Sequence, residues 1–576
     1  MLLVNSSPKP RDYNRLGSSS GSNVCQSMGA VMRPRRSPRI RSQAEHGSQN
    51  AVQEASHDVS QAQQVYSAAI LEAALDEYTY KKVDANASED PIHAIKRRID
   101  AVGRELQTVT EEDYRRLSSA EASASGRTAA PTALPEEVLR DLGVQLRSIK
   151  QNILPMKIKA LPKQAIKPEG TGAEIMLQGF NWESWRHDWY NSLGQQIDAI
   201  ADAGFTVVWL PPPTDSVSAQ GYMPRDLYNL DSKYGSEVDL LELIRRMQSR
   251  GIKVLGDAVL NHRCASEQGE HGVWNKYGGR LGWDNRAIVG DDPNFRGKGN
   301  RSSGDHFLAA PNIDHSQDFV KRDLSEWMQW LRTHAGYDGF RLDFVKGFHG
   351  SHVKDYMEAS VPSFAVGEYW DTMVYEWDGS PAHNQDSHRQ RTVDWINAAG
   401  GLSTAFDITT KGILHAVFER CEYWRLRDNA GKPPGLIGWW PSRAVTFIEN
   451  HDTGSSQGHW RFPDHALEQG YAYILTHPGT PCVMYDHMFH DSNVSHVVRR
   501  LVELRKRLGL HCRSGVSILH ASHDVYAAEI DQKLVVKVGP GDFAPDLEKW
   551  KIADCGSAWA VWELKDPSAA AAAHAE

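Results

Sequence analysis

The segment GFRLDF, residues 339–344, is a short apolar run that ends on a carboxylate, Asp343. The same pattern recurs twice further along the chain, with Glu368 in FAVGEYW and Asp452 in FIENHDTG. In a closed barrel of parallel strands, the carboxyl ends of all strands meet at one face, so acids placed there converge. Three converging carboxylates suit cleavage of a glycosidic bond, which needs a nucleophile or base and a proton donor.

Short apolar runs alternate with amphipathic helical patterns from Glu174 onward, which is typical of βαβ units and a parallel sheet. Eight such runs, with helical patterns between most of them, predict one (β/α)8 TIM barrel and therefore an α/β fold. The predicted strands are EIMLQGF (174–180), FTVVWLP (205–211), KVLGDAVL (253–260), GFRLDF (339–344), FAVGEY (364–369), TAFDIT (404–409), AVTFIEN (444–450) and CVMYD (482–486).

The connection after the third predicted strand is unusually long, spanning residues 263–312, and is rich in Gly, Asn and Asp. Loops of this length are usually functional or disordered, so we expect a lobe beside the cleft. The catalytic barrel with its lobe is placed at 171–508. After it, SILHASHDVYAAEI, KLVVKVG and WAVWELK alternate like antiparallel strands and predict a C-terminal β-sheet domain at 509–565. The Ala-rich tail, 566–576, is expected to be disordered.

The first 44 residues are rich in Arg and Ser and hold a single acid, Asp12. They lack the apolar stretch of a secretory signal, and this composition is typical of an organelle transit peptide. Residues 45–170 combine apolar residues at helical spacing with Ala/Ser/Thr-rich linkers, which predicts a partly disordered helical extension. Its role is open between a loosely ordered spacer and a coiled-coil or partner-binding segment.

The composition excludes several classes of protein. Of 576 residues, 40% are hydrophobic and 24% charged, as in a soluble globular protein. A net charge of -9 gives no basic field for nucleic acid or anionic membranes, and no apolar run approaches the roughly 20 residues of a transmembrane helix. The 18 Trp and 19 Tyr suit stacking on sugars, although most must be core residues. Six Cys without CxxC spacing favour a reducing compartment without structural disulfides.

Four segments, in chain order, resemble the signature segments of glycoside hydrolase family 13: DAVLNHR (257–263), GFRLDFVKG (339–347), VGEYW (366–370) and FIENHD (447–452). Stretches such as VVWLPPPTDSVSAQGYMP and GWWPSRAVTFIENHDTGS are similar to plant-type α-amylases, most closely the plastidial form. The resemblance runs from about residue 174 to 563, roughly two-thirds of the chain. Four ordered segments joined by long similar stretches are far more specific than any one motif.

The resemblance implies a role for each carboxylate. Asp343 corresponds to the nucleophile of a retaining enzyme, and Asp452 to the carboxylate that grips the 2- and 3-hydroxyls of the distorted sugar. Glu368 corresponds to the general acid/base, which must be protonated near neutral pH. A neighbouring negative charge and an apolar wall should therefore raise its pKa. Arg341 lies two residues before Asp343 on the same strand face, where its charge would keep the nucleophile ionised.

Further residues are implied to bind substrate. Tyr222 corresponds to the ring that stacks beneath the sugar at the cleavage point, whereas Asp257 resembles a structural acid. The other implied substrate contacts are His262, His451, Lys346 and Trp370. Trp439 and Trp440, in GWWP, correspond to a surface platform for starch; the alternative is that this pair anchors the core.

Calcium binding is where the chain departs from the family pattern. The resemblance implies ligands at Asn261, Ser302, Asp305, Asn312 and Gly347, with Ser302 and Asn312 standing where the family has carboxylates. His306 and Gly282 likewise replace acids that hold additional calcium ions in secreted plant relatives. Because the affinity of a site for Ca²⁺ falls when charged oxygens are removed from it, these changes predict weak or absent binding, unless Asp291 or Asp292 compensates.

These observations together predict an endo-acting, retaining α-amylase that cleaves internal α-1,4-glucosidic bonds of starch and related α-glucans. The transit-like start and a starch substrate predict the chloroplast, in the plastid stroma. We expect a monomer without a nucleotide or redox cofactor. Two alternatives are a debranching or glucanotransferase enzyme of the same family and a non-catalytic glucan-binding or regulatory protein. Whether Cys264, next but one to His262, acts as a redox switch is open.

Overall fold

The computed structural model of this protein describes residues 166–565. The predicted transit segment, nearly all of the predicted extension and the Ala-rich tail lie outside the described residues. Within 166–565, no helix is both long enough and apolar enough to span a bilayer.

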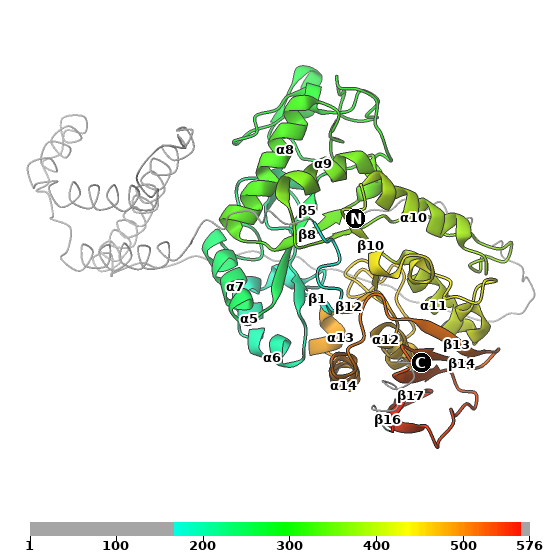
Figure 1. The fold of residues 1–576 in the computed structure, drawn as a ribbon. Coiled ribbons are helices and arrows are strands. Elements are labelled where there is room, and N and C mark those ends of the chain that lie inside the picture. Colours follow the sequence, from blue (N-terminus) through cyan, green and yellow to red (C-terminus); the bar gives the residue numbers. More distant parts are fainter. Residues whose placement is uncertain (1–165, 566–576) are drawn as a thin grey trace, which may run out of the picture. The chain divides into compact units, whose positions relative to one another are not determined.

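Eight parallel strands close into a barrel in the order β1-β12-β11-β10-β9-β8-β5-β2 (Figure 1). The predicted fold class is confirmed, and each predicted strand contains or overlaps an observed one. The last strand is shifted, because Tyr485 begins a helix where CVMYD is predicted to continue the strand. The barrel strands are β1 (Met176–Gln178), β2 (Val207–Trp209), β5 (Lys253–Val259), β8 (Gly339–Asp343), β9 (Phe364–Gly367), β10 (Thr404–Phe406), β11 (Ala444–Thr446) and β12 (Thr480–Met484).

The register between β5 and β8 fixes the centre of the barrel. Asp257 lies opposite Arg341, and Val259 lies opposite Asp343. Both strands are almost entirely buried, as expected of parallel strands covered by helices. Gly339 opens β8 because a Cβ there would lie 1.9 Å from the carbonyl oxygen of Phe364 on β9. This close approach is available only to glycine.

The helices surround the barrel, and sequence signals mark several of their ends. Ser236 and Asp239 form a capping box at the start of α7, and Gly509, at φ +62°, ends α14. The described helices are α5 (Trp189–Gly194), α6 (Ile197–Asp202), α7 (Glu237–Ser249), α8 (Asp318–Trp330), α9 (Gly350–Ser360), α10 (Asp386–Ala398), α11 (Ile408–Arg420), α12 (Leu467–Thr476), α13 (Tyr485–Phe489) and α14 (Ser492–Leu508).

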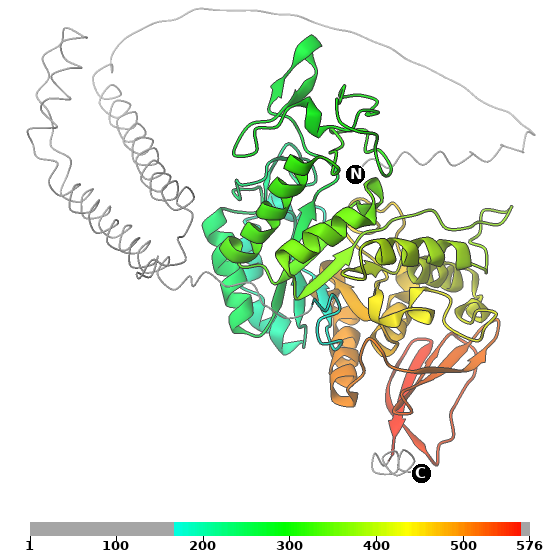
Figure 2. The same cartoon turned by 45° about the horizontal axis from the view of Figure 1, so that its top comes forward.

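The predicted lobe lies between β5 and α8 and is seen in green at the top of Figure 2. It contains the short hairpin of β6 (Glu267–Gln268) and β7 (Trp274–Lys276), while β3 (Asp215–Ser216) and β4 (Pro224–Asp226) pair after β2. The buried guanidinium of Arg263 donates hydrogen bonds to the carbonyl oxygens of Arg225, Gly278 and Leu281. One side chain therefore joins the base of the lobe to the β4 segment.

The C-terminal domain is a five-stranded antiparallel sheet in the order β13-β14-β15-β17-β16. It packs against α12, where Trp559 donates a hydrogen bond to Glu468 (2.8 Å) and Tyr526 pairs with His477 (2.9 Å). The strands are β13 (Val516–Ala521), β14 (Tyr526–Ile530), β15 (Leu534–Val538), β16 (Trp550–Gly556) and β17 (Trp559–Leu564). The exact boundaries of the domains stay a prediction.

Residues 166–170, which the sequence analysis places in the extension, contact the barrel. The backbone N–H of Ala365 on β9 donates to the carbonyl oxygen of Pro168 at 3.1 Å. The carboxylate of Glu169 is buried and pairs with Arg443 (2.6 Å) and with Arg513. This segment thereby connects β9 with both the approach to β11 and the start of the C-terminal domain.

Arg505 on α14 is fully buried and donates to the carbonyl oxygens of Leu475 (3.0 Å), His477 (2.8 Å) and Gly479 (2.8 Å). Replacing Arg505 with Met leaves these three acceptors without a donor. We expect the free energy of unfolding to fall by about 2–4 kcal/mol, roughly 1 kcal/mol per lost bond. Denaturant unfolding would measure this loss, with the exposed neighbour Lys506→Met as the matched control. Equal stabilities of the two variants would contradict the assignment.

Candidate active site

A single buried guanidinium lies at the centre of the candidate site. Arg341 Nη1 donates to Asp343 Oδ1 at 2.7 Å and to Asp257 Oδ1 at 2.9 Å, and its Nη2 pairs with Glu368 Oε1 at 2.7 Å. All four side chains are nearly inaccessible to solvent. The carboxylates of Asp343, at the end of β8, and Glu368, just after β9, thus bind the two terminal nitrogens of one planar group.

Glu368, one of the three carboxylates that contact Arg341, has a raised pKa. Burial raises the pKa of Glu368 to about 8; Arg341 opposes this shift, while Asp343 and Asp452 add to it. The predicted direction of the shift and its predicted causes agree with this result. Asp343 Oδ2 is buried and has no hydrogen-bond partner among residues 166–565. The site thus combines a carboxyl that holds a proton at neutral pH with an unengaged carboxylate oxygen.

Asp257 supports this centre from the neighbouring strand. Its Oδ2 accepts hydrogen bonds from Tyr222 Oη (2.8 Å) and Trp209 Nε1 (3.0 Å), while the carboxylate also contacts Arg341. Burial raises the pKa of Asp257 to about 7, with Arg341 opposing the rise. Asp257 therefore orients both the guanidinium of Arg341 and the ring of Tyr222. This is a structural role of the kind that the sequence predicts for Asp257.

Three aromatic rings are stacked beside the carboxylates. Tyr222 lies parallel to His451, with ring centroids 5.2 Å apart, and Trp182 is parallel to Tyr222 at 6.2 Å. Trp182 is half-buried and follows β1, so it presents an indole close to the predicted sugar-stacking ring. Sequence reasoning missed Trp182, although an aromatic residue just past a barrel strand is a signal that could have found it.

The two predicted histidines are buried and differently engaged. His262 Nε2 donates to the carbonyl oxygen of Tyr222 at 2.8 Å, and Asn261 Nδ2 lies 3.3 Å from its Nδ1. Contact with a sugar would require one of these bonds to open. His451 Nε2 lies 3.5 Å from Asp452 Oδ2, and burial lowers the pKa of His451 to about 4. His451 is therefore neutral at physiological pH.

The loop after β11 carries Asp452, and hydrogen bonds connect this loop to the loop after β1. Ser455 and Asn181 both donate to Asp486, the first at 2.8 Å and the second at 2.6 Å. Ser456 donates to Glu183 at 2.5 Å. These bonds connect the loop of the third carboxylate with the loop that carries Trp182.

A buried lysine binds the same loop further along the chain, at Trp460. Lys411 on α11 donates to the carbonyl oxygen of Trp460 at 3.0 Å, and its Nζ lies 4.2 Å from the centroid of the Trp460 ring. Trp460 in turn contacts Trp370 edge-on, with centroids 6.3 Å apart. The predicted substrate residue Trp370 is thus backed by an aromatic and cationic cluster that sequence reasoning missed.

Lys346 lies at the start of the loop after β8. Its ammonium group pairs with Asp305 of the lobe at 2.9 Å and with Asp371 at 2.8 Å. It is partly exposed, with 27% of its side chain accessible. Lys346 therefore bridges the lobe to the segment after Glu368, at the edge of the catalytic cluster.

Trp439 and Trp440, the predicted surface pair, differ in how far their rings are exposed. Trp439 is 39% exposed and lies 4.1 Å from the guanidinium carbon of Arg389, measured to the ring centroid. Trp440 is half-buried and packs against the hydrophobic core. Trp439 alone offers an exposed ring, while Trp440 anchors the segment.

The residues at the predicted calcium position are engaged with one another. Asn312 accepts from the backbone N–H of Phe307 (2.7 Å) and donates to Asp292 (2.8 Å), and Ser302 donates to the carbonyl oxygen of Gly304. Asp292 also accepts three backbone N–H groups, so its oxygens are already occupied. Within 166–565, no group of three or more His, Cys, Asp or Glu side chains could hold a metal ion. The residues present do not fit the carboxylate-rich site that Ca²⁺ prefers.

Cys264 is buried, and burial raises the pKa of its thiol to about 11. The reactive thiolate is therefore scarce at neutral pH. In the part of the chain that the structure describes, Cys264 is a free cysteine, as are the other four. The structure offers no support for a disulfide at this position.

Family models match two parts of the chain. The model "Alpha amylase, catalytic domain" matches residues 188–383, and "Alpha-amylase C-terminal beta-sheet domain" matches residues 507–563. The first match includes Arg341, Asp343 and Glu368 but ends before Asp452.

The chain is also similar to curated plant proteins. It is 52% identical over 497 residues to "Alpha-amylase 3, chloroplastic" of Arabidopsis thaliana, a match that covers 84% of this chain and 56% of that protein. It is 48% identical over 394 residues to "Probable alpha-amylase 2" of the same plant, covering 68% of this chain and 94% of the relative. The chain thus spans just over half the length of the first relative and nearly all of the second.

Solved structures show the same fold at low identity. An α-amylase from Malbranchea cinnamomea aligns with a TM-score of 0.50 and 17% identity, over 65% of this chain and 86% of the other. A γ-cyclodextrin glucanotransferase from an alkalophilic Bacillus clarkii aligns with a TM-score of 0.50 and 18% identity, over 71% and 72% of the two chains.

The hydrogen-bonded lobe leads to a prediction about metal removal. Exhaustive dialysis against a chelator should leave the thermal midpoint unchanged within about 1 °C, because no ligand-bound state is lost. Asn312→Ala should instead lower the midpoint, since it removes the partner of Asp292 and Phe307. Differential scanning calorimetry with metal analysis would measure both. A midpoint that falls on chelation and recovers with added Ca²⁺ would contradict this reading.

Proposed function

Because this chain belongs to the α-amylase family of glycoside hydrolases, we propose that it is an endo-acting, retaining α-amylase. Its substrates are the internal α-1,4-glucosidic bonds of starch and related α-glucans. The observation that carries the proposal is the shared guanidinium of Arg341, which holds Asp343 and Glu368 side by side. A retaining glycosidase needs its two carboxyl groups only about 5–5.5 Å apart.

In the first half of the reaction, Asp343 Oδ2 attacks the anomeric carbon. This oxygen is suited to the task because it is buried and carries no hydrogen bond from residues 166–565. Glu368, protonated at neutral pH, gives its proton to the glycosidic oxygen as the C–O bond breaks. The leaving chain departs with a free hydroxyl, and the sugar remains as an ester on Asp343.

In the second half, Glu368 is a carboxylate and accepts a proton from water. The resulting hydroxide-like oxygen attacks the anomeric carbon, and the ester bond to Asp343 breaks. Two inversions at the same carbon give net retention, and both carboxyl groups return to their starting states. Asp452 binds the sugar hydroxyls through both steps. Its loop is held in place by the hydrogen bonds of Ser455 with Asp486 and of Lys411 with Trp460.

The other predicted residues are assigned to substrate positioning. Tyr222, with Trp182 beside it, provides a stacking face beneath the sugar, and His451 donates to its hydroxyls in the neutral form. Trp370 and Lys346 contact the chain beyond the cleavage point. Trp439 provides a separate contact with starch on the surface.

The location and assembly of the protein are also proposed. The similarity to a relative named as chloroplastic and the transit-like composition of residues 1–44 support the plastid, and within it the stroma. We propose a monomer that acts without a nucleotide or redox cofactor and without tightly bound calcium. Starch or another α-glucan is the expected macromolecular partner.

The bond type and stereochemistry test the function. We expect internal shortening of amylose, no attack on the α-1,6 bonds of pullulan, and products that first appear as α-anomers. Chromatography and NMR of the products of a defined malto-oligosaccharide would measure these. Asp343→Asn should lower kcat by about three orders of magnitude or more. The control Asp464→Asn removes an exposed carboxylate from the loop that carries Asp452, and its kcat should be close to that of the parent.

Other product patterns would assign the protein to the alternatives. Cleavage confined to α-1,6 bonds would indicate a debranching enzyme, and cyclic or transferred products a glucanotransferase. Complete absence of reducing-sugar release from soluble starch would indicate a glucan-binding protein on an inactive barrel.

The proton held by Glu368 sets a pH dependence. Activity requires the protonated form, so kcat/KM should fall about tenfold per pH unit above the pKa of Glu368, which is about 8. Because Asp452 raises that pKa, Asp452→Asn should move the alkaline limb of the residual activity to lower pH. Steady-state kinetics on a short chromogenic malto-oligosaccharide would show both effects. An alkaline limb below pH 6 in the parent would contradict the assignment of Glu368 as the acid.

A further inference from the structure

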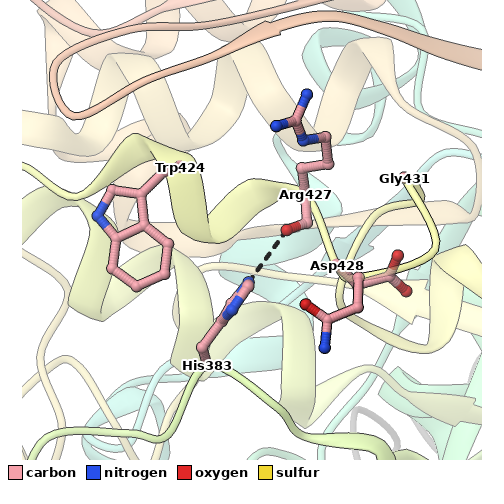
Figure 3. Close-up of a pocket in the computed structure, with 6 residues that line it drawn as sticks. His383, Trp424, Arg427, Asp428 and Gly431 are labelled. Carbon is pink, nitrogen blue, oxygen red and sulfur yellow. Dashed lines mark hydrogen bonds between the residues drawn. The ribbon is translucent and has the colours of Figure 1, made fainter.

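A polar cavity lies outside the catalytic cluster, between the segment before α10 and the loop after α11. It has a volume of about 420 Å³ and is lined by His383, Trp424, Arg427, Asp428, Asn429 and Gly431 (Figure 3). None of these residues belongs to the candidate active site.

A second cavity continues the first. It has a volume of about 350 Å³, shares His383, Asp428 and Asn429 with the first, and reaches Trp439. Three residues line both hollows, so the two adjoin, with Trp424 in the first and Trp439 in the second. We call the two adjoining hollows together the Trp424–Trp439 groove.

The Trp424 ring is exposed but held in place. It is 36% accessible, and the ring of His383 meets it edge-on with centroids 4.9 Å apart. His383 is itself positioned by a 3.0 Å hydrogen bond to the carbonyl oxygen of Arg427. The guanidinium carbon of Arg425 lies 4.8 Å from the Trp424 centroid, and Arg425 is fixed by the carbonyl oxygen of Pro381 at 2.7 Å. A preorganised ring loses little conformational entropy when a ligand stacks on it.

Arg389 and Asp428 are paired beside the groove, whereas Arg427, which lines it, is exposed and forms no ion pair with residues 166–565. Arg389 is buried and neutralised by Asp386 (2.5 Å) and Asp428 (2.9 Å). Asp428 also accepts the backbone N–H groups of Ala430 and Lys432, which shapes the loop around the cavity. An indole in each hollow, with hydrogen-bonding groups beside it, suits a neutral polyhydroxylated ligand better than an ion.

We propose that the Trp424–Trp439 groove binds a segment of α-1,4-glucan as a non-catalytic site, so that the surface contact at Trp439 continues to Trp424. This inference rests on the proposed function for the identity of the sugar. The two carboxylates that line the groove, Asp386 and Asp428, also share one guanidinium, that of Arg389, but Asp386 is 53% exposed whereas Asp343 and Glu368 are both buried. We therefore expect no cleavage of the bound segment. The groove instead keeps the enzyme on a polymer while the cleft cuts another part of it.

Binding and cleavage can be measured separately. In the Asp343→Asn background, which cannot cut, retention in gels containing amylopectin reports polymer binding by the full chain. Trp424→Ala should weaken retention about 3- to 10-fold, the range expected for one ring contact. In the parent background, Trp424→Ala should leave kcat/KM for a short chromogenic malto-oligosaccharide unchanged, because that substrate fills only the cleft.

The matched control is Trp274→Ala, which removes another half-exposed indole, from β7 of the lobe. Retention of Trp424→Ala equal to the parent, or weakened no more than by Trp274→Ala, would overturn the proposal. If Trp424→Ala does not fold, the exposed Asn429→Ala decides: weaker retention supports the groove, and unchanged retention overturns it. If the parent fails to cleave the short substrate, the proposed function is refuted. The retention of the Trp424→Ala variant then still tests whether the groove binds glucan.

Discussion

The buried ion cluster around Arg341 is the interaction on which the site depends. Burying a guanidinium is costly unless its charge and its donors find partners, and here the carboxylates of Asp257, Asp343 and Glu368 supply them. The cation also allows three acids to sit close together without mutual repulsion expelling one of them. Because it only partly offsets the burial of Glu368, that residue keeps its proton while Asp343 is left with a free oxygen.

The third carboxylate reaches the cluster by a different route. Asp452 lies on a loop rather than on a strand, and its position depends on fastenings to elements distant in the chain. Ser455 ties the loop to Asp486, and Lys411 ties its other end through Trp460. Trp460 also contacts Trp370, so the loop that carries Asp452 is linked to a residue that is predicted to bind substrate.

Buried arginines play a recurring structural part away from the site. Arg263 holds the base of the lobe by three carbonyl oxygens, Arg505 collects three more beneath the C-terminal domain, and Arg389 joins α10 to the loop of the surface groove. A guanidinium can satisfy several carbonyl groups at once because its donors are fixed in a plane. In the lobe, the Asn312–Asp292 bond engages a side chain for which the family resemblance implies a calcium-ligand position.

The barrel, its lobe, the C-terminal sheet and the strand-end positions of Asp343 and Glu368 could all be predicted from the amino-acid sequence alone. These follow from local periodicity: a buried parallel strand is a short apolar run, and the acid that ends it must lie at the carboxyl face. The direction of the Glu368 pKa shift could also be predicted, since it needs only burial and nearby acids. Other features depend on how distant segments pack: Trp182 stacks beside Tyr222, Lys411 contacts Trp460, and Trp424 and Trp439 line adjoining hollows. These contacts join residues whose separation along the chain carries no periodic signal, so they exist only once the loops have packed.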